Sequence, residues 1–159
     1  DGAADVDGFL KYSLSVQNRR KSRVGYAFEN HLEAIFMPFG VRYTRGGITE
    51  NRAKPDFIFP SIEEYHNSEF PESNLTMLGV KSTCKDRWRQ VLSEAARIGH
   101  KHLVTLEPGI SEHQTTEMQV VNLQLILPTP LHGTYRPSQR SWLSSIDEFI
   151  KLVLLRQQR

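Results

Sequence analysis

Two charged residues stand at the ends of short apolar segments, and a third lies on the helix predicted after them. Asp56 opens the apolar segment 57–59, Lys81 follows the apolar run 77–80, and Glu94 lies thirteen residues after Lys81. Magnesium takes hard oxygen ligands, usually one or two carboxylates completed by waters and phosphate oxygens. A lysine ammonium beside such an ion can orient the attacking water or stabilise developing negative charge. The three residues therefore predict a phosphodiesterase site in which Asp56 and Glu94 hold Mg²⁺ and Lys81 assists the nucleophile.

Two further residues are candidates for the same site. Glu29 lies on the first predicted helix, where we expect it to act as a second ligand or as a base that holds a water. Glu33 is one helical turn further on, so both glutamates can face the same neighbour. Tyr65 lies between the two strands that carry Asp56 and Lys81, and we expect it near the phosphate that is attacked.

Each member of the central trio also has a purely structural interpretation. Asp56, which follows a proline, could cap a turn. Lys81 could form a buried ion pair with Asp56, because a buried ammonium without a partner is costly. Glu94 could be a surface acid paired with a neighbouring arginine. Separately these residues are weak signals, and their order along the chain is what favours a site.

The elements that must position these residues alternate between helix and strand patterns. Apolar residues repeat every three or four positions over 24–36, which predicts an amphipathic helix. Strands are predicted at 41–44, 56–59, 75–83, 101–106 and 120–127, and further helices at 86–98, at 111–118 and after an N-cap at Ser141. Residues 60–74 are expected to form a long surface excursion. The pattern predicts an α/β domain with a mixed central sheet flanked by helices, spanning 21–159 after an N-terminal arm at 1–20.

Composition limits the classes of protein further. The chain has 159 residues, of which 38% are hydrophobic and 24% charged, as in ordinary globular domains. No apolar run is long enough to cross a membrane. The single cysteine, Cys84, excludes an intrachain disulfide and favours a cytoplasmic location. His100 and His102 alternate as on a strand edge and are expected at the surface. Because the chain begins at Asp1, we expect an N-terminal part to precede it.

The net charge of +2 conceals clusters of one sign. Acidic residues gather in the segment 63–72, and basic residues gather in three other segments. Such separation suits a polyanionic partner, and the alternative is a set of solvated faces. The basic clusters are Arg19, Arg20, Lys21 and Arg23; Arg42, Arg45, Arg52 and Lys54; and Lys81, Lys85, Arg87 and Arg89.

The order Pro55-Asp56 followed by Lys81 resembles the PD-(D/E)xK nuclease superfamily. Most of its members carry an acid two residues before the lysine, where this chain has Gly79. A branch of restriction enzymes that includes EcoRII, Ecl18kI and PspGI shows the same departure and takes a glutamate from the following helix. Glu94 matches that glutamate, and the resemblance covers roughly residues 22–155.

Enzymes of this branch read bases with a basic–acidic–arginine triplet, which Lys85-Asp86-Arg87 resembles. An arginine fork can bond guanine O6 and N7, and an aspartate can accept from the cytosine amino group. Lys85 can reach guanine or a phosphate, and Arg89 is expected to join the DNA contact. The competing interpretation is a helix cap with solvated charges.

The resemblance implies a restriction-endonuclease-like fold and Mg²⁺-dependent hydrolysis of double-stranded DNA. The expected sites are CCWGG-like, with 5′-phosphate ends as products and the W bases extruded from the stack. Candidate stacking residues are Phe9, Tyr12, Tyr43, Tyr65 and Trp88. A homodimer is expected because the target is nearly palindromic, and an N-terminal effector domain is expected in the same chain.

Two other functions remain open on the sequence. One is a non-catalytic DNA-binding module of the same fold, in which Asp56 and Lys81 only form an ion pair; Gly79 favours it. The other is a structure-specific repair or junction nuclease, which keeps the chemistry without reading bases.

Overall fold

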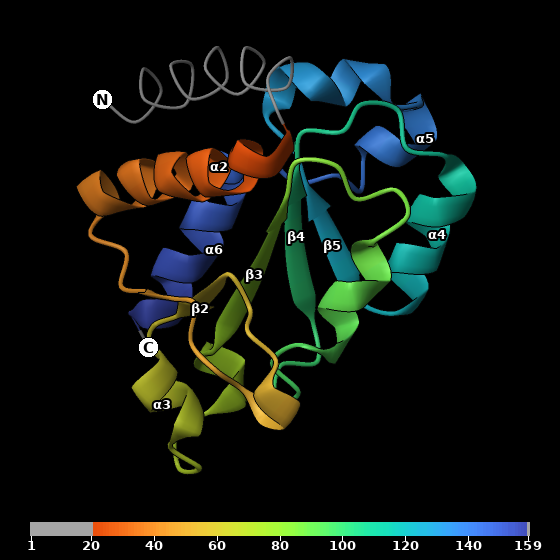
Figure 1. Cartoon of the computed structure of the whole chain (residues 1–159). Helices are drawn as coiled ribbons and strands as arrows, with labels where there is room; N and C mark the ends of the chain where they lie inside the picture. Colours follow the sequence, from red (N-terminus) through yellow and green to blue (C-terminus); the bar gives the residue numbers. More distant parts are fainter. Residues whose placement is uncertain (1–20, 159) are drawn as a thin grey trace.

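The computed structural model describes the backbone of residues 21–158 and the side chains of residues 27–158. Its centre is a five-stranded mixed sheet whose strands follow the chain order from edge to edge (Figure 1). The first three strands pair antiparallel and the last three pair parallel. The strands are β1 (Thr44–Arg45), β2 (Phe57–Phe59), β3 (Thr76–Lys81), β4 (Lys101–Thr105) and β5 (Leu123–Ile126). The predicted mixed α/β sheet is confirmed, and the arm at 1–20 lies outside the described residues.

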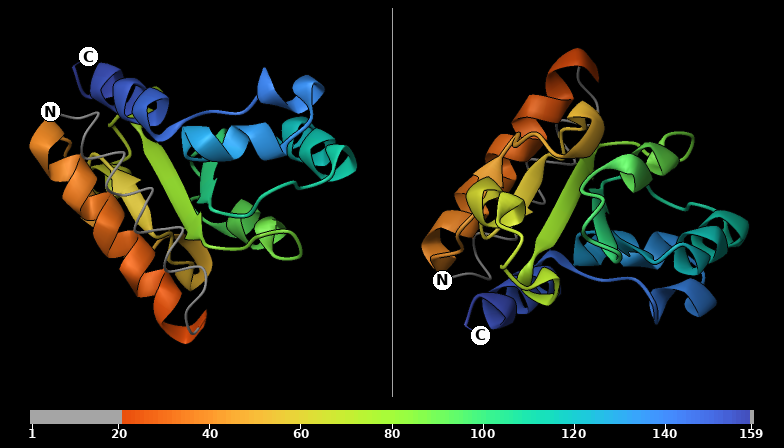
Figure 2. Two further views of the ribbon diagram at one scale, coloured as in Figure 1. Left: turned by 90° about the horizontal axis from the view of Figure 1, so that it is seen from above. Right: turned by 90° about the horizontal axis from the view of Figure 1, so that it is seen from below.

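The helices cover both faces of this sheet (Figures 1 and 2). The α-helices are α2 (Lys21–Phe36), α3 (Ile62–His66), α4 (Glu112–Val120), α5 (Pro137–Arg140) and α6 (Ile146–Gln157). The 3-10 helices are η1 (Met37–Phe39), η2 (Glu50–Arg52), η3 (Glu72–Asn74), η4 (Trp88–Ser93) and η5 (Thr129–Thr134). Within residues 21–158, none of the helices has the length and apolar character that crossing a membrane would require.

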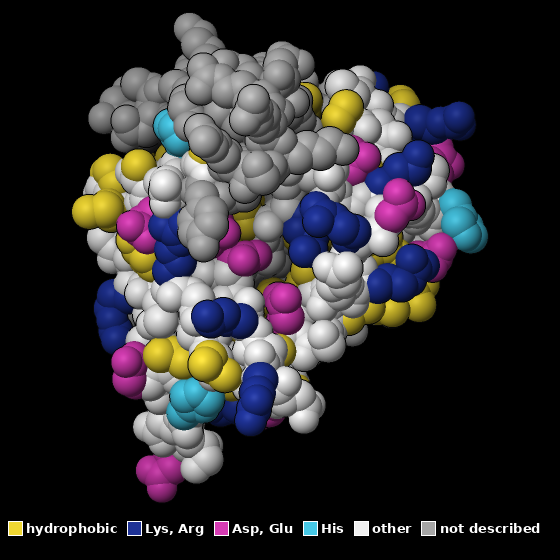
Figure 3. Space-filling view, in the orientation of Figure 1, with side chains coloured by type: hydrophobic (Ala, Val, Ile, Leu, Met, Phe, Trp, Pro, Cys, Tyr) yellow, Lys and Arg dark blue, Asp and Glu magenta, His cyan; other side chains and the backbone are white. Residues whose placement is uncertain are grey.

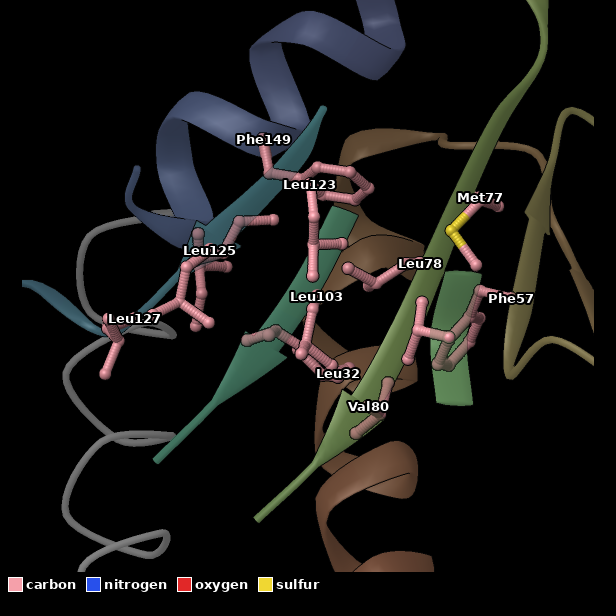
Figure 4. Close-up of a cluster of buried hydrophobic side chains, with 14 of the residues drawn as sticks. Leu32, Phe57, Met77, Leu78, Val80, Leu103, Leu123, Leu125, Leu127 and Phe149 are labelled. Atoms are coloured by element: carbon pink, nitrogen blue, oxygen red, sulfur yellow. The ribbon is translucent and has the colours of Figure 1, made fainter. Parts of the chain in front are cut away.

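The main core lies between the sheet and the helices α2 and α6. Side chains of β3, β4 and β5 meet those of the two helices there (Figure 4). Phe36 of α2 lies 5.4 Å from Phe57 and 5.6 Å from Phe59 between ring centroids. Phe149 of α6 lies 5.5 Å from Phe59. These ring contacts hold α2 against β2, the strand that directly follows Asp56.

The opposite face of the sheet is covered by η4. Met77, Gly79 and Lys81 alternate along β3 and share one face, because side chains in a strand point to opposite sides in turn. Val91 of η4 packs directly over Gly79. This contact places the segment that ends at Glu94 above the end of β3.

The segment after Lys81 differs most from the prediction. We expected a helix over 86–98, and only η4 forms, as a 3-10 helix. Glu94 is extended, with φ −88° and ψ 147°, and Ala95 is left-handed, with φ 50°. The backbone amides after Glu94 bond to side chains of other elements instead of continuing the helix.

Three other boundaries were predicted wrongly. The 60–74 excursion contains α3, which Ser61 caps at the Glu64 amide and which carries buried Tyr65. The strand predicted from 120 begins at Leu123, because α4 continues to Val120. The last helix is capped by Ser145, four residues after the predicted Ser141. The helix that Ser111 was predicted to cap is confirmed as α4.

His102 was also predicted wrongly. Its side chain is 2% exposed, because β4 is an interior strand between β3 and β5. Its ring lies 5.2 Å from that of Phe149 and 5.0 Å from that of His100. His100, two residues earlier and just before β4 begins, is exposed as expected.

Candidate active site

Asp56 lies at the entrance to β2 and bonds to the neighbouring strand. Its Oδ2 accepts a hydrogen bond of 2.7 Å from the amide of Val80. The antiparallel pairing of Phe57 with Leu78 brings Asp56 to the end of β3 that carries Lys81. Burial raises the pKa of the Asp56 carboxyl, and the Val80 amide, Lys81 and Arg45 oppose that rise. The bond is directed across strands, so Asp56 does more than cap its own turn.

Lys81 is the last residue of β3 and is partly buried. Its Nζ lies 3.5 Å from Oε1 of Gln90 on η4. Lys81 also interacts electrostatically with both Asp56 and Glu94. Among the described residues its ammonium forms no close ion pair with Asp56, so that structural interpretation of Lys81 is not supported.

Glu94 follows η4 and turns its carboxylate into the same region. Its Oε1 is buried and has no hydrogen-bond partner among the described residues. Burial and the nearby charge of Asp56 raise the pKa of Glu94 to about 7, against the lowering effects of Lys81 and Lys101. A buried carboxylate oxygen without a partner is costly, so its environment suits a cation better than an ordinary surface acid.

The arginines that were alternative partners of Glu94 bind elsewhere. Arg97 donates to the backbone carbonyls of Tyr65, Asn67 and Phe70. Arg87 donates to the carbonyl of Thr83 at 3.0 Å. Arg89 pairs with Glu117. The surface ion pair proposed for Glu94 is therefore wrong for all three arginines.

Glu29 reaches the site from α2. Its Oε1 accepts a hydrogen bond of 3.2 Å from Arg45 Nε, and Arg45 Nη1 lies 3.6 Å from Glu33. Burial raises the pKa of Glu29, and the charge of Asp56 raises it further. The structure thus brings Glu29 within electrostatic range of Asp56, while its role as ligand or base stays a prediction.

Gly79 stands in a tightly packed position two residues before Lys81. A Cβ built at Gly79 would lie 3.0 Å from Val91 Cγ2 and 3.3 Å from Val91 Cγ1. An aspartate or glutamate there would press on the Val91 side chain, which would have to shift by a few tenths of an ångström. Glu94, which follows η4 three residues after Val91, supplies a carboxylate without that clash.

The residues present fit a hard divalent ion held by few protein ligands. Residues 27–158 contain no group of three or more acidic, histidine or cysteine side chains arranged as a metal site. Asp56 and Glu94 are the candidate ligands, and Mg²⁺ commonly takes only one or two carboxylates and keeps several of its waters. The buried Glu94 oxygen is the observation that favours an ion here.

Tyr65 occupies a different environment from the one expected. It is 1% exposed, and its hydroxyl donates to Glu50 Oε1 at 2.5 Å and accepts from the Arg97 amide at 3.1 Å. Burial, reinforced by Glu50, raises the pKa of Tyr65 to about 12. These contacts join α3 to the segment after Glu94, and the catalytic role of Tyr65 stays a prediction.

The triplet Lys85-Asp86-Arg87 forms an exposed turn between β3 and η4 instead of the start of an α-helix. Oε1 of Glu107 accepts hydrogen bonds from the amides of Cys84 at 2.7 Å and Lys85 at 2.9 Å. These bonds fix the backbone of the turn while its side chains face solvent. The exposed turn is compatible with base reading, and the base-reading role of the three side chains stays a prediction.

Arg89 is engaged within the protein. Its guanidinium pairs with Glu117 of α4 and lies 4.2 Å from the ring centroid of Trp88. Similar pairs tie Arg42 to Glu64 and Arg136 to Glu112. On the face drawn in Figure 3, basic and acidic side chains are interspersed and form no single continuous basic patch. The separation of charge expected from the sequence is thus partly offset by pairing across elements.

Of the candidate stacking residues within the described part of the chain, Trp88 and Tyr65 belong to the core and Tyr43 is partly buried against it. Trp88 and Tyr65 are 1% exposed, and Trp88 Nε1 donates to Gln114 at 3.1 Å. Tyr43 packs against Phe36 and Phe57. Phe9 and Tyr12 lie outside the described residues.

Two charged residues near the site were not predicted as parts of it. Arg45 links Glu29 to β1, and Lys101 is 7% exposed at the start of β4, where it interacts with Glu94. The signal for Lys101 was its place at the head of an apolar strand, where a lysine must be buried or paired.

Comparison with known proteins identifies the family. The family model described as EcoRII C terminal matches residues 1–150, a range that includes the segment predicted as an arm. The type II restriction enzyme EcoRII of Escherichia coli is 47% identical over 150 residues, covering 94% of this chain and 37% of that protein. The type II restriction enzyme SsoII of Shigella sonnei is 26% identical over 127 residues, covering 72% of this chain and 41% of that protein. The chain thus spans about two fifths of the length of these curated relatives.

Solved structures show the same fold. Metal-depleted Ecl18kI in complex with uncleaved DNA superposes with a TM-score of 0.74 at 22% identity, covering 91% of this chain and 49% of that one. The restriction endonuclease PspGI in a substrate DNA complex gives 0.71 at 18% identity, covering 93% and 67%. The predicted restriction-endonuclease fold is confirmed. On the family match over 150 residues and the 47% identity to EcoRII, the chain belongs to the EcoRII C-terminal family of type II restriction enzymes.

Proposed function

We propose that this chain is the catalytic domain of a type II site-specific deoxyribonuclease that hydrolyses double-stranded DNA at CCWGG-like sites. Mg²⁺ is the proposed cofactor, and 5′-phosphate ends are the proposed products. The observation that carries the proposal is the buried Oε1 of Glu94, which has no hydrogen-bond partner within the described part of the chain and interacts electrostatically with Asp56 and Lys81. Family membership supports the reaction class.

The proposed chemistry assigns one task to each side chain. Asp56 and Glu94 hold the divalent ion, which supplies a hydroxide nucleophile and neutralises charge on the phosphate when it is bound. The Lys81 ammonium orients the attacking water and stabilises the negative charge that develops on the phosphate oxygens. Glu29 accepts a hydrogen bond from Arg45 and is placed to hold a water or accept its proton. Breaking the P–O3′ bond leaves the phosphate on the 5′ end.

Base reading is assigned to the turn 85–87. Arg87 is proposed to bond guanine through its planar fork, Asp86 to accept from cytosine, and Lys85 to contact guanine or a phosphate. Support comes from the exposure of the three side chains and from the Glu107 bonds that hold the backbone beneath them. Arg89 would contact DNA only by leaving Glu117, so we assign it a phosphate contact of smaller effect.

The proposed partners are duplex DNA, a second copy of the chain and an N-terminal effector domain. Ecl18kI and PspGI, which share this fold, were solved in complex with DNA. The coverage of only 37% of the Escherichia coli relative leaves room for a further domain in a longer protein. Because the proposed substrate is intracellular DNA, we place the activity in the bacterial cytoplasm.

Plasmid cleavage with Mg²⁺ tests the proposal directly. We expect site-dependent fragments from a plasmid with CCWGG sites, none from a matched plasmid without them, and none with EDTA. Lys81→Ala should lower the cleavage rate by a factor on the order of 100 or more and leave DNA binding intact, because it removes charge stabilisation only. Lys151→Ala, an exposed lysine of α6, is the matched control and should cut normally.

Other outcomes select the alternatives. Binding without cutting under every metal tried would favour the non-catalytic module. Equal cutting of both plasmids would support the proposed active site and contradict the base-reading role of Lys85-Asp86-Arg87. That result is the one expected of a structure-specific nuclease.

A further inference from the structure

The backbone that follows Glu94 is held in a conformation that its local sequence does not favour. Glu94 is extended and Ala95 is left-handed at φ 50°, with a side chain that is 0% exposed. For a residue with a Cβ, the left-handed conformation is sterically unfavourable. Contacts from elsewhere in the fold must therefore hold this turn, and with it the direction of the Glu94 side chain.

Three consecutive amides of the turn donate to side chains from two other segments. Ala95 N donates to Thr49 Oγ1 at 3.2 Å, and Ala96 N donates to Glu50 Oε1 at 3.3 Å. Arg97 N donates to the Tyr65 hydroxyl, which itself donates to Glu50. One side of the turn is thus satisfied by acceptors on the 49–50 loop and on α3.

The carbonyl side of the turn is held by a single buried cation. Lys101 Nζ donates to the carbonyl of Ala95 at 2.9 Å and to that of Ile98 at 2.5 Å. Lys101 is the first residue of β4, an interior strand of the sheet. Its ammonium also interacts electrostatically with Glu94 and Glu50. A buried ammonium is costly unless its donors are used, and here they are used on the two carbonyls that close the turn.

We propose that Lys101 is a positioning residue for Glu94. Its ammonium anchors the turn 95–98 to the sheet and so fixes the carboxylate of Glu94 in the position from which it holds the metal. The inference rests on the proposed function, because it assigns Lys101 an effect that operates through the metal ligand. Groups that orient metal ligands typically contribute a factor of 10 to 100 in metal affinity or activity.

Mn²⁺ binding measured by electron paramagnetic resonance tests the inference without turnover. The full chain is titrated with Mn²⁺ on an uncleavable CCWGG duplex. Lys101→Met keeps the length of the side chain and removes its donors, and it should raise the half-saturating Mn²⁺ concentration about tenfold. Lys101→Arg should recover part of the loss, because its guanidinium can donate to both carbonyls.

A double variant shows whether the effect passes through Glu94. In a Glu94→Gln background, Lys101→Met should cause little further loss of Mn²⁺ affinity, since the ligand that it positions is already gone. Full additivity of the two substitutions would overturn the inference.

Val153→Ala is the control for general destabilisation. Val153 is buried on α6, among the helices that cover the opposite face of the sheet. It should lower stability while leaving the Mn²⁺ titration unchanged. A Lys101→Met chain with the same Mn²⁺ titration as Val153→Ala would contradict the positioning role.

Two remaining outcomes are also decisive. If Lys101→Met does not fold, the variant Thr49→Val is used in its place. Thr49→Val removes the acceptor of the Ala95 amide with little change in side-chain volume. An unchanged Mn²⁺ affinity of Thr49→Val would overturn the inference. If the unmodified chain binds no Mn²⁺, the proposed function itself fails. If the unmodified chain binds Mn²⁺ and cleaves DNA, and Lys101→Met has the same Mn²⁺ affinity, the positioning role is overturned while the proposed function stands.

Discussion

Gly79 disfavours an acidic side chain at the position where most of the PD-(D/E)xK superfamily carries one. The residue lies in β3 two positions before Lys81, and Val91 packs over it. A side chain here must push against a close-packed neighbour, and overpacking of this kind typically costs about 1–3 kcal/mol.

Gly79→Asp tests this explanation, because it introduces the acid that most of the superfamily carries. We expect a loss of about 1–3 kcal/mol in the free energy of unfolding and no gain in cleavage. Chemical denaturation and plasmid cleavage measure the two quantities. Gly133→Ala is the control, since a Cβ there meets nothing within 4 Å. A stable and more active Gly79→Asp chain would contradict this account.

His102 makes stability depend on pH. Burial, together with His100 and Arg156, lowers its pKa from 6.5 to about 3. As the pH falls, the folded state therefore takes up this proton at a lower pH than the unfolded state does. The free energy of unfolding is unaffected by this proton above pH 6.5. It decreases by about 1.4 kcal/mol per pH unit as the pH falls from 6.5 towards 3.

His102→Leu should flatten that dependence, because it removes the titrating group from the core. The free energy of unfolding, measured by denaturant titration between pH 7.5 and 5.5, gives the slope. His100→Gln, at the exposed neighbour, should change the slope less. Equal slopes in the unmodified chain and in His102→Leu would rule out His102 as the cause.

At the scale of elements, helix ends decide which residues reach the site. The 3-10 helix η4 stops at Ser93 because the next amides are bound by Thr49, Glu50 and Tyr65. An α-helix through 98 would use those amides internally and would turn Glu94 to a different side. The end of η4 thus sets the direction of the carboxylate.

The start of α6 allows a test of the same kind. Ser145 Oγ accepts from the Glu148 amide at 3.1 Å, and Glu148 Oε1 accepts from the Ser145 amide at 3.1 Å. Ser145→Ala should lower the free energy of unfolding by about 1 kcal/mol, because it removes this capping box. Ser141→Ala, at the position predicted from sequence, should change it by less than about 0.5 kcal/mol. Thermal denaturation of both variants decides between the two serines.

At the scale of the whole molecule, residues 27–158 present the candidate reading turn 85–87 and the candidate site around Glu94 once per chain. A nearly palindromic target presents each half-site once on each strand, so two copies related by a twofold axis would complete the complex. We propose that two chains bind one CCWGG duplex.

Sedimentation velocity measures that stoichiometry. The chain with a CCWGG duplex should sediment as two chains per duplex, whereas a scrambled duplex at the same salt concentration should yield no defined complex. One chain per specific duplex would contradict the dimer and would require reading of the site by a single turn.

The sequence by itself determined the α/β class, the strands along the chain and a set of candidate site residues. Apolar runs mark the central strands because these strands are buried on both faces, and a charge at the end of such a run is conspicuous. Asp56 and Lys81 were selected in this way and Glu94 by its place on the predicted helix after Lys81. The structure brings the three within electrostatic reach of one another, and their catalytic roles stay predictions.

Only the tertiary structure decided how those residues are presented. Periodicity predicted a helix through Glu94, but it ends earlier, because the amides of residues 95–97 donate to Thr49, Glu50 and Tyr65. Lys101 also donates to the carbonyl of Ala95. Arg89 was expected to contact DNA and is paired with Glu117, which is distant in sequence. Local patterns report burial and period, whereas these outcomes depend on partners from distant segments, which local sequence does not encode.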